Sequence, residues 1–143
     1  MKRKIYMKRD RVLIVGCSRF GASIATNLSL KGENVVVLDE QNNSFRKLDD
    51  SFSGYEMVGN GLDLDVLKES GIEQSKMLIS STDDDNINIF IAEVAAIIFL
   101  VPDIYVRLND PSKAIVLEHL NVKIIYPFEL SMNEFERMRS EGV

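Results

Sequence analysis

Short apolar runs alternate with segments of helical spacing along nearly the whole chain. Runs rich in β-branched or aliphatic residues predict six strands, at residues 11–15, 34–38, 55–58, 77–79, 104–108 and 123–126. Helical spacing, capping residues and prolines predict intervening helices, at 21–30, 44–48, 64–69, 84–100, 111–120 and 129–138. Continuous apolar strands are typical of a parallel sheet that is covered on both faces. We therefore predict an α/β fold, a doubly wound Rossmann-like parallel sheet of six strands in the order 3-2-1-4-5-6 with helices on both faces.

One predicted helix is more apolar than a single domain of this size requires. Its second half, Val94 to Val101, reads VAAIIFLV, and Ile89 to Ala92 precede it. The whole stretch is shorter than the roughly 20 residues that cross a membrane. A helix that is apolar on nearly every side must be buried on more than one side. We therefore expect a second subunit to cover it.

Composition describes an ordinary soluble domain and excludes several classes of site. The chain has 143 residues, of which 45% are hydrophobic and 27% are charged, which suits a single domain with a real core. Cys17 and His119 are its single cysteine and single histidine, so neither a zinc site nor a disulfide framework is expected. The length also leaves no room for a catalytic domain beside a cofactor-binding domain.

Charge is distributed unevenly along the chain. The net charge is −5, yet six of the 17 basic residues lie before position 12: Lys2, Arg3, Lys4, Lys8, Arg9 and Arg11. The rest of the chain is strongly acidic, which argues against nucleic-acid binding. We interpret residues 1–10 as a solvated basic tail rather than a targeting segment or a contact for anionic lipid.

A glycine-rich loop follows the first predicted strand and opens a helix. It reads Gly16-Cys17-Ser18-Arg19-Phe20-Gly21, a Gly-x-Gly-x-x-Gly pattern with serine in the second place. The free N–H groups at such a helix start bind phosphate. Ser18 tightens the approach of a pyrophosphate, although its hydroxyl can itself bond a phosphate oxygen. Asp39 ends the second strand, where a carboxylate accepts hydrogen bonds from ribose hydroxyls and repels a 2′-phosphate. The pattern predicts a nucleotide site that disfavours NADP.

Further candidates end the other strands. Gly59, Asn60 and Gly61 can approach adenine or form a plain turn, and we hold the two interpretations equal. Ser81 and Thr82 face the glycine-rich loop across the crevice. The alternative is capping of the following helix, for which Thr82 and Asp83 are both suitable. Arg107 ends the fifth strand, where it can reach a phosphate or pair with a nearby carboxylate.

Three further features bear on chemistry. The guanidinium of Arg19, inside the loop, can bind a phosphate of its own subunit or of a neighbour. The acidic run Asp83 to Asp85 is interpreted as a complement to the helix dipole rather than a cation site. Cys17 has no base beside it in the pattern, so we expect inert packing, and we expect no catalytic residue and no metal site in this chain.

Several of these segments together resemble a known family. They are VLIVGCSRFGASIATNLSLKGENVVVLDE, then GNGLDLDVLKESGIEQSKMLISSTDDDNINIFIAEVA, then VPDIYVRLNDP. From Arg11 to about Glu129 the chain resembles the RCK or TrkA-N nucleotide-binding domain of Trk/Ktr potassium uptake regulators. The resemblance implies NAD(H) or an adenine nucleotide (ATP, ADP or AMP) as ligand. It implies two kinds of partner: further copies of the chain, in a homodimer or a larger ring, and a membrane potassium transporter or channel subunit. It implies a cytoplasmic location, peripheral to the inner face of the membrane through that partner, and sensing rather than catalysis.

The resemblance also assigns roles to residues. Residues Gly16, Cys17, Ser18, Arg19, Phe20 and Gly21 would hold phosphates; Asp39, with Glu40 beside it, would hold ribose; Gly59, Asn60 and Gly61 would line adenine; Ser81, Thr82 and Arg107 would complete the pocket. The sequence departs from the family at Ser18 and Asn60, at Glu129, which lies one place later than the usual acidic residue, and in the extra apolar character of residues 96–100. The resemblance sets the nucleotide-binding domain at 11–128 and a C-terminal helix and tail at 129–143, with no second ligand-binding domain.

Two other functions stay open from the residues alone. One is a small NAD-dependent oxidoreductase, and the other is an assembly module whose crevice no longer binds a ligand, for which Ser18 is the only indication. Between the ligands, Ser18 and Arg19 favour ATP or ADP over NAD(H) by a small margin.

Overall fold

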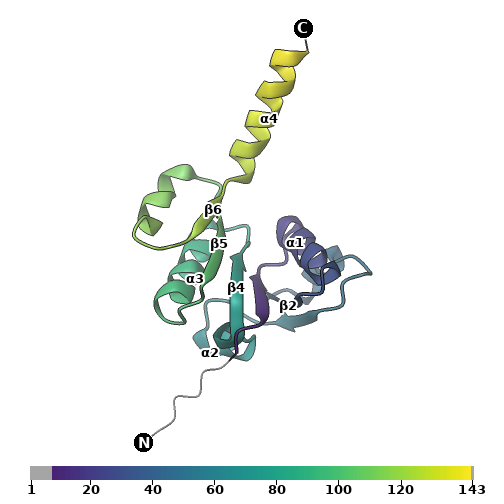
Figure 1. The fold of residues 1–143 in the computed structure, drawn as a ribbon, viewed down its shortest axis with the longest axis vertical. Helices are drawn as coiled ribbons and strands as arrows, with labels where there is room; N and C mark the ends of the chain where they lie inside the picture. Colours follow the sequence, from purple (N-terminus) through teal and green to yellow (C-terminus); the bar gives the residue numbers. More distant parts are fainter. Residues whose placement is uncertain (1–7, 143) are drawn as a thin grey trace, which may run out of the picture.

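The computed structural model describes residues 8–142, and it contains a single six-stranded sheet in this range. The strands are β1 (Arg11–Val15), β2 (Asn34–Asp39), β3 (Tyr55–Val58), β4 (Ser75–Ser80), β5 (Asp103–Arg107) and β6 (Lys123–Ile125). Their order is β3-β2-β1-β4-β5-β6, and each neighbouring pair is parallel (Figure 1). The predicted doubly wound fold and strand order are confirmed.

The helical elements are α1 (Arg19–Leu30), α2 (Leu64–Glu69), α3 (Asp85–Ile97) and α4 (Pro127–Glu141), with the 3₁₀ turns η1 (Asn42–Lys47), η2 (Ile72–Gln74) and η3 (Pro111–Leu117). The helices predicted at 44–48 and 111–120 are therefore 3₁₀ turns. The long helix ends at Ile97, before the predicted residue 100, and the chain then turns through Leu100, which has a positive φ of 53°. The last helix is longer than predicted at both ends.

Two hydrophobic layers cover the sheet. Leu13 and Val15 of β1 pack toward α2 and α3, where Leu67 and Ile91 are fully buried. Val12 and Ile14 of the same strand point to the opposite face, against Ala22 and Ala25 of α1. Both sets belong to one continuous apolar run, so this strand is buried on both faces as the sequence predicts.

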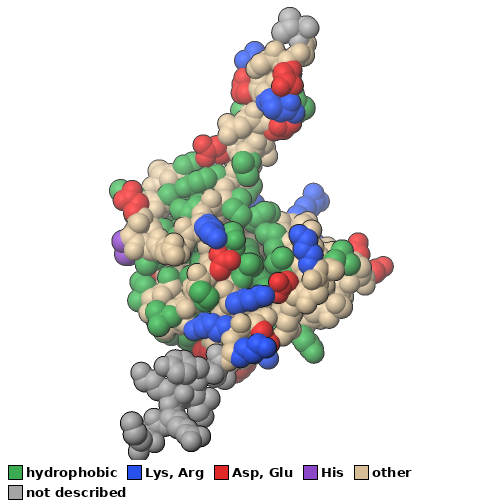
Figure 2. All heavy atoms as spheres, viewed as in Figure 1, with side chains coloured by type: hydrophobic (Ala, Val, Ile, Leu, Met, Phe, Trp, Pro, Cys, Tyr) green, Lys and Arg blue, Asp and Glu red, His purple; other side chains and the backbone are tan. Residues whose placement is uncertain are grey.

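The sheet is less covered at its β5–β6 side. Ile104 and Val106 of β5 are buried, whereas Tyr105 between them is only half-buried. From here α4 extends away from the body (Figure 1), and none of its residues is buried. Figure 2 shows hydrophobic side chains gathered at the base of α4.

The apolar helix keeps an open side in the single chain. Ile91, Ala92 and Ala95 of α3 are buried, but Phe90 and Ile97 are 39% and 58% exposed. The second subunit expected over this helix stays a prediction. Within residues 8–142, no helix combines the length and the hydropathy that a membrane crossing requires.

The predicted basic tail reaches the body at its end. Residues 1–7 lie outside the described range. Arg9 donates hydrogen bonds to the carbonyls of Ser75 (3.0 Å) and Phe99 (2.7 Å), and the Asp10 N–H donates to the Gln74 carbonyl. Residues 9 and 10 are thus held against the end of the sheet at which the parallel strands begin.

Candidate functional site

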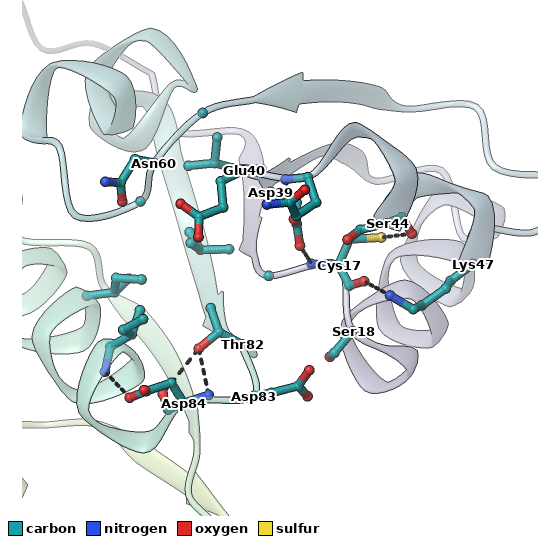
Figure 3. Close-up of a pocket in the computed structure, with 18 residues that line it drawn as sticks. Cys17, Ser18, Asp39, Glu40, Ser44, Lys47, Asn60, Thr82, Asp83 and Asp84 are labelled. Carbon is teal, nitrogen blue, oxygen red and sulfur yellow. Dashed lines mark hydrogen bonds between the residues drawn. The ribbon is translucent and has the colours of Figure 1, made fainter.

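A pocket of about 490 Å³ opens at the carboxyl ends of β1, β2, β3 and β4. β1 lies between β2 on one side and β4 on the other. The first three strands run outward from β1 in one direction and the last three in the other, so the strand order reverses at this point. This is the place where doubly wound sheets bind ligands. Figure 3 shows the lining: Ser44 and Lys47 lie beside Cys17, while Thr82, Asp83 and Asp84 come from the wall after β4.

Ser18 holds the loop after β1 in place. Its hydroxyl oxygen accepts the Gly21 N–H (3.1 Å), which makes Ser18 the N-cap of α1. The same hydroxyl donates to the Ser81 carbonyl (2.7 Å) at the end of β4. The hydroxyl that was expected to be available to a phosphate oxygen therefore has two partners already. The first N–H groups of a helix have no carbonyl of the preceding turn to bind. The free N–H groups at the start of α1 therefore form a positive helix end that attracts anions.

The two glycines of the loop have distinct steric reasons. Gly16 has φ +103°, and a Cβ there would lie 2.5 Å from the backbone nitrogen of Thr82. A Cβ on Gly21 would meet the carbonyl oxygen of Gly16 and lie 2.6 Å from the Ser81 hydroxyl. Glycine at both positions lets the loop after β1 pass directly over the end of β4.

Asp39 joins the loop to the end of β2. One carboxylate oxygen accepts the Cys17 N–H and the other accepts the Gln41 N–H, each at 2.8 Å. A carboxylate has about four acceptor positions. Two of them therefore remain free to accept further hydrogen bonds at the pocket wall.

Cys17 and Lys47 are in contact beside Asp39 in the pocket lining. The Cys17 thiol donates to the Ser44 carbonyl (3.4 Å), and the Lys47 ammonium donates to the Cys17 carbonyl (3.2 Å). Burial, and then the charge of Asp39, raises the pKa of the Cys17 thiol to about 11. The thiol is therefore protonated near neutral pH and is a weak nucleophile.

The turn after β3 supplies the next part of the lining. Gly59, Asn60 and Gly61 all line the pocket. The Asn60 side-chain oxygen accepts the Leu62 N–H (2.9 Å), as in a common Asx turn. Its amide NH₂ is not used in that turn, so both interpretations of this segment remain compatible with the geometry.

A buried asparagine organises the ends of β4 and β5. The Asn88 side chain donates to the carbonyls of Thr82 and Arg107 (both 2.9 Å) and accepts the Thr82 N–H and hydroxyl. Thr82 lines the pocket, and Asp84 is the N-cap of α3, accepting the Ile87 N–H. The N-cap is therefore Asp84 and not Thr82 or Asp83, the two capping candidates. The interpretation of the acidic run as a complement to the helix start applies to Asp84, whereas Asp85 accepts the N–H groups of Asn109 and Asp110.

Arg107 lies outside the pocket lining. Its guanidinium pairs with the exposed carboxylate of Asp83 at 3.2 Å, which is the ion pair that we considered as the alternative to phosphate binding. Its Nε is buried and has no hydrogen-bond partner in the described part of the chain.

The expected site residues thus separate into two groups. Those that line the pocket are Gly16, Cys17, Ser18, Asp39, Glu40, Gly59, Asn60, Gly61 and Thr82. Those that do not are Arg19, Phe20, Gly21, Ser81 and Arg107, of which Gly21 and Ser81 support the loop and Arg19 is exposed. Polar lining residues that the sequence analysis did not assign to the ligand are Gln41, Ser44, Lys47, Asp83 and Asp84. Gln41 and Ser44 follow Asp39 closely, which is the signal available for them, whereas the sequence pattern does not place Lys47 in the pocket.

Sequence comparison gives a family and a relative. The family model described as the TrkA-N domain matches residues 12–127. The Trk system potassium uptake protein TrkA of Streptomyces coelicolor is 37% identical over 114 residues, which cover 80% of this chain and 51% of the relative. The chain therefore spans about half the length of that relative.

Structural comparison gives the same fold. A Shewanella denitrificans Kef C-terminal domain in an AMP-bound form superposes with a TM-score of 0.72 at 20% identity, over 93% of this chain and 82% of that one. The GsuK channel bound to NAD superposes with a TM-score of 0.69 at 15% identity, over 84% of this chain and 22% of that one.

Proposed function

Because the chain belongs to the TrkA-N domain family, we propose that it is a nucleotide-sensing regulatory subunit of a potassium transporter or channel. The observation that carries the proposal is the pocket at the strand-order reversal, where a phosphate loop and an oriented carboxylate share one cavity. The TrkA relative, whose name states potassium uptake, supports the transport role.

The ligand that this pocket suits is NAD(H) or an adenine nucleotide, ATP, ADP or AMP. Phosphates would lie against the loop Gly16–Gly21, ribose against Asp39 and Glu40, and adenine near Gly59, Asn60 and Gly61. Ser81, Thr82 and Arg107 support the loop and the far wall. The AMP-bound and NAD-bound structures of the same fold support this ligand class.

The subunit would act by changing its assembly when the ligand binds, without catalysis. A ligand shifts an equilibrium between two arrangements only if it binds one of them more tightly. The exposed side of α3 and the unburied α4 provide surfaces for a homodimer or larger ring. In this proposal residues 11–128 are the nucleotide-binding domain, 129–143 are a C-terminal helix and tail, and residues 1–10 are a basic tail. The protein works in the cytoplasm, attached to the membrane through its partner, and binds no nucleic acid.

Calorimetry with NAD, NADH, ATP, ADP and AMP tests the binding step directly. Saturating ligand should raise the melting temperature, because binding to the native state stabilises it. If the melting curve with each nucleotide equals that of the ligand-free protein, the proposal is contradicted. Sustained oxidation of NADH with carbonyl substrates would instead support the oxidoreductase.

The transport role needs a cellular test. Deleting the gene, or introducing Asp39→Ala, should change the rate of potassium uptake. Uptake that is indifferent to both changes would contradict the regulatory role even if nucleotides bind.

A further inference from the structure

The charged side chains that line the pocket are strongly unbalanced. Four carboxylates line the pocket, from Asp39, Glu40, Asp83 and Asp84. Among residues 8–142, Lys47 is the only lysine or arginine that lines it. Asp83 is paired with Arg107 from outside the lining. An anionic ligand would therefore meet a mostly negative wall, so the position of the single cation decides where its phosphate charge is tolerated.

That cation lies next to the phosphate loop. The 3₁₀ turn η1 begins three residues after Asp39 and carries Lys47 at its end. The Lys47 ammonium lies 3.2 Å from the carbonyl oxygen of Cys17, the residue directly before the N-cap of α1. Figure 3 shows Lys47 reaching across to this loop from the element after β2. The ammonium thus lies beside the helix start, where the N–H groups already favour a phosphate.

The ammonium has capacity left for a ligand. A lysine has three N–H donors, and within residues 8–142 the Lys47 ammonium makes one hydrogen bond, to the neutral carbonyl of Cys17. The side chain is exposed along the pocket and contributes to neither hydrophobic layer of the sheet. It can therefore turn toward a phosphate without disturbing the core.

We propose that Lys47 is a specificity-determining residue of this pocket, whose ammonium binds a phosphate of the ligand and makes affinity depend on phosphate charge. The inference rests on the proposed nucleotide-binding function and adds a residue outside the glycine-rich loop to it. The ligand class is a 5′-phosphorylated adenosine. Adenosine has no phosphate, so its affinity should not depend on the charge of Lys47.

Titration calorimetry of Lys47→Gln tests this with adenosine, AMP, ADP, ATP and NAD. The phosphorylated ligands should bind roughly threefold to tenfold more weakly to the variant, while adenosine binds equally to both proteins. The difference should shrink when ionic strength rises from roughly 0.05 M to 0.5 M, because salt screens an exposed pair. Lys47→Arg should restore most of the affinity.

Arg46→Gln is the matched control, because Arg46 is an exposed cation on the same turn and does not line the pocket. If both variants lose the same affinity for the phosphorylated ligands, the loss follows from the net charge of the protein and the proposal is overturned. It would also be overturned by unchanged binding to Lys47→Gln, which leaves the nucleotide site standing, or by an equal loss for adenosine, which indicates altered structure. Failure of the unmodified protein to bind any of the five ligands would overturn both this inference and the proposed function.

Discussion

The carboxylate of Asp39 at the end of β2 accepts the backbone N–H of Cys17 in the loop after β1, over 2.8 Å. The expected ribose-binding residue is thus also a structural partner of the phosphate loop. Its second oxygen holds the Gln41 N–H in the same way. Substitution at this position must therefore change folding stability as well as ligand binding.

Asp39→Ala should lower the free energy of unfolding by about 1–3 kcal/mol, since two hydrogen bonds to a charged group are lost. Asp39→Asn should lose less, because its carbonyl oxygen still accepts one N–H. Urea denaturation measures both, and Glu40→Ala, on the neighbouring exposed residue, is the control. An Asp39→Ala protein as stable as the unmodified one would show that these contacts contribute nothing.

Gly16→Ala should destabilise the protein by more than about 3 kcal/mol. The substitution combines a positive φ of 103° with a Cβ that would lie 2.5 Å from the Thr82 backbone. Gly32 provides the comparison, because its φ is +85° but a Cβ there would have no atom within 4 Å. Gly32→Ala should cost only about 1 kcal/mol. Similar losses for the two variants in thermal or urea unfolding would contradict the steric account.

The sequence predicts the sheet well because its signals are local and repeated. Each buried strand is a continuous apolar run, and Leu13 and Ile14 show why: adjacent residues of β1 enter different hydrophobic layers. Helix ends are predicted less well. Helix α3 ends at Ile97, and the turn after it places Leu100 at a positive φ, a conformation that a leucine in the sequence does not indicate.

Site residues can be predicted from the sequence where the local backbone requires a particular residue type. They are missed where tertiary contacts decide which side chains line the pocket. Gly16 and Asp39 are readable because a tight turn and a strand end require such residues. Lys47 is not readable, because its place in the pocket follows from the path of a 3₁₀ turn. Arg107 is ambiguous in sequence, since only the structure shows that it pairs with Asp83.

The buried thiol of Cys17 should make stability fall with pH in one window. Its pKa is raised from about 9 to about 11, so between these values the unfolded state loses the thiol proton first. The free energy of unfolding should therefore decrease more steeply with pH than in Cys17→Ala, and the two slopes should agree below pH 9. Urea denaturation across the window gives both slopes. Identical slopes throughout would contradict a raised pKa.

Asp83→Asn should tighten nucleotide binding while leaving stability nearly unchanged. Its carboxylate is 86% exposed, so the ion pair with Arg107 is worth at most about 1 kcal/mol. Removing its charge makes the pocket wall less repulsive to phosphate, and it frees the Arg107 guanidinium. Calorimetry at low salt should show stronger binding, whereas Glu73→Gln, an exposed carboxylate outside the pocket lining, should not change it. Weaker binding to the Asp83 variant would mean that the carboxylate itself contacts the ligand.

An apolar stripe on α4 should mediate self-association. Phe128, Met132 and Phe135 lie at positions i, i+4 and i+7, so they share one face, and they are 68%, 43% and 51% exposed. A helix that buries none of its residues in its own chain gains little from that chain, so contact with another copy would supply the missing burial. Replacing Met132 and Phe135 together with glutamate should shift sedimentation toward the monomer. Unfolding of the monomer should change by less than about 1 kcal/mol, because these side chains leave no cavity. Leu30→Glu, at an exposed leucine ending α1, is the control, and equal dissociation by both variants would place the interface elsewhere.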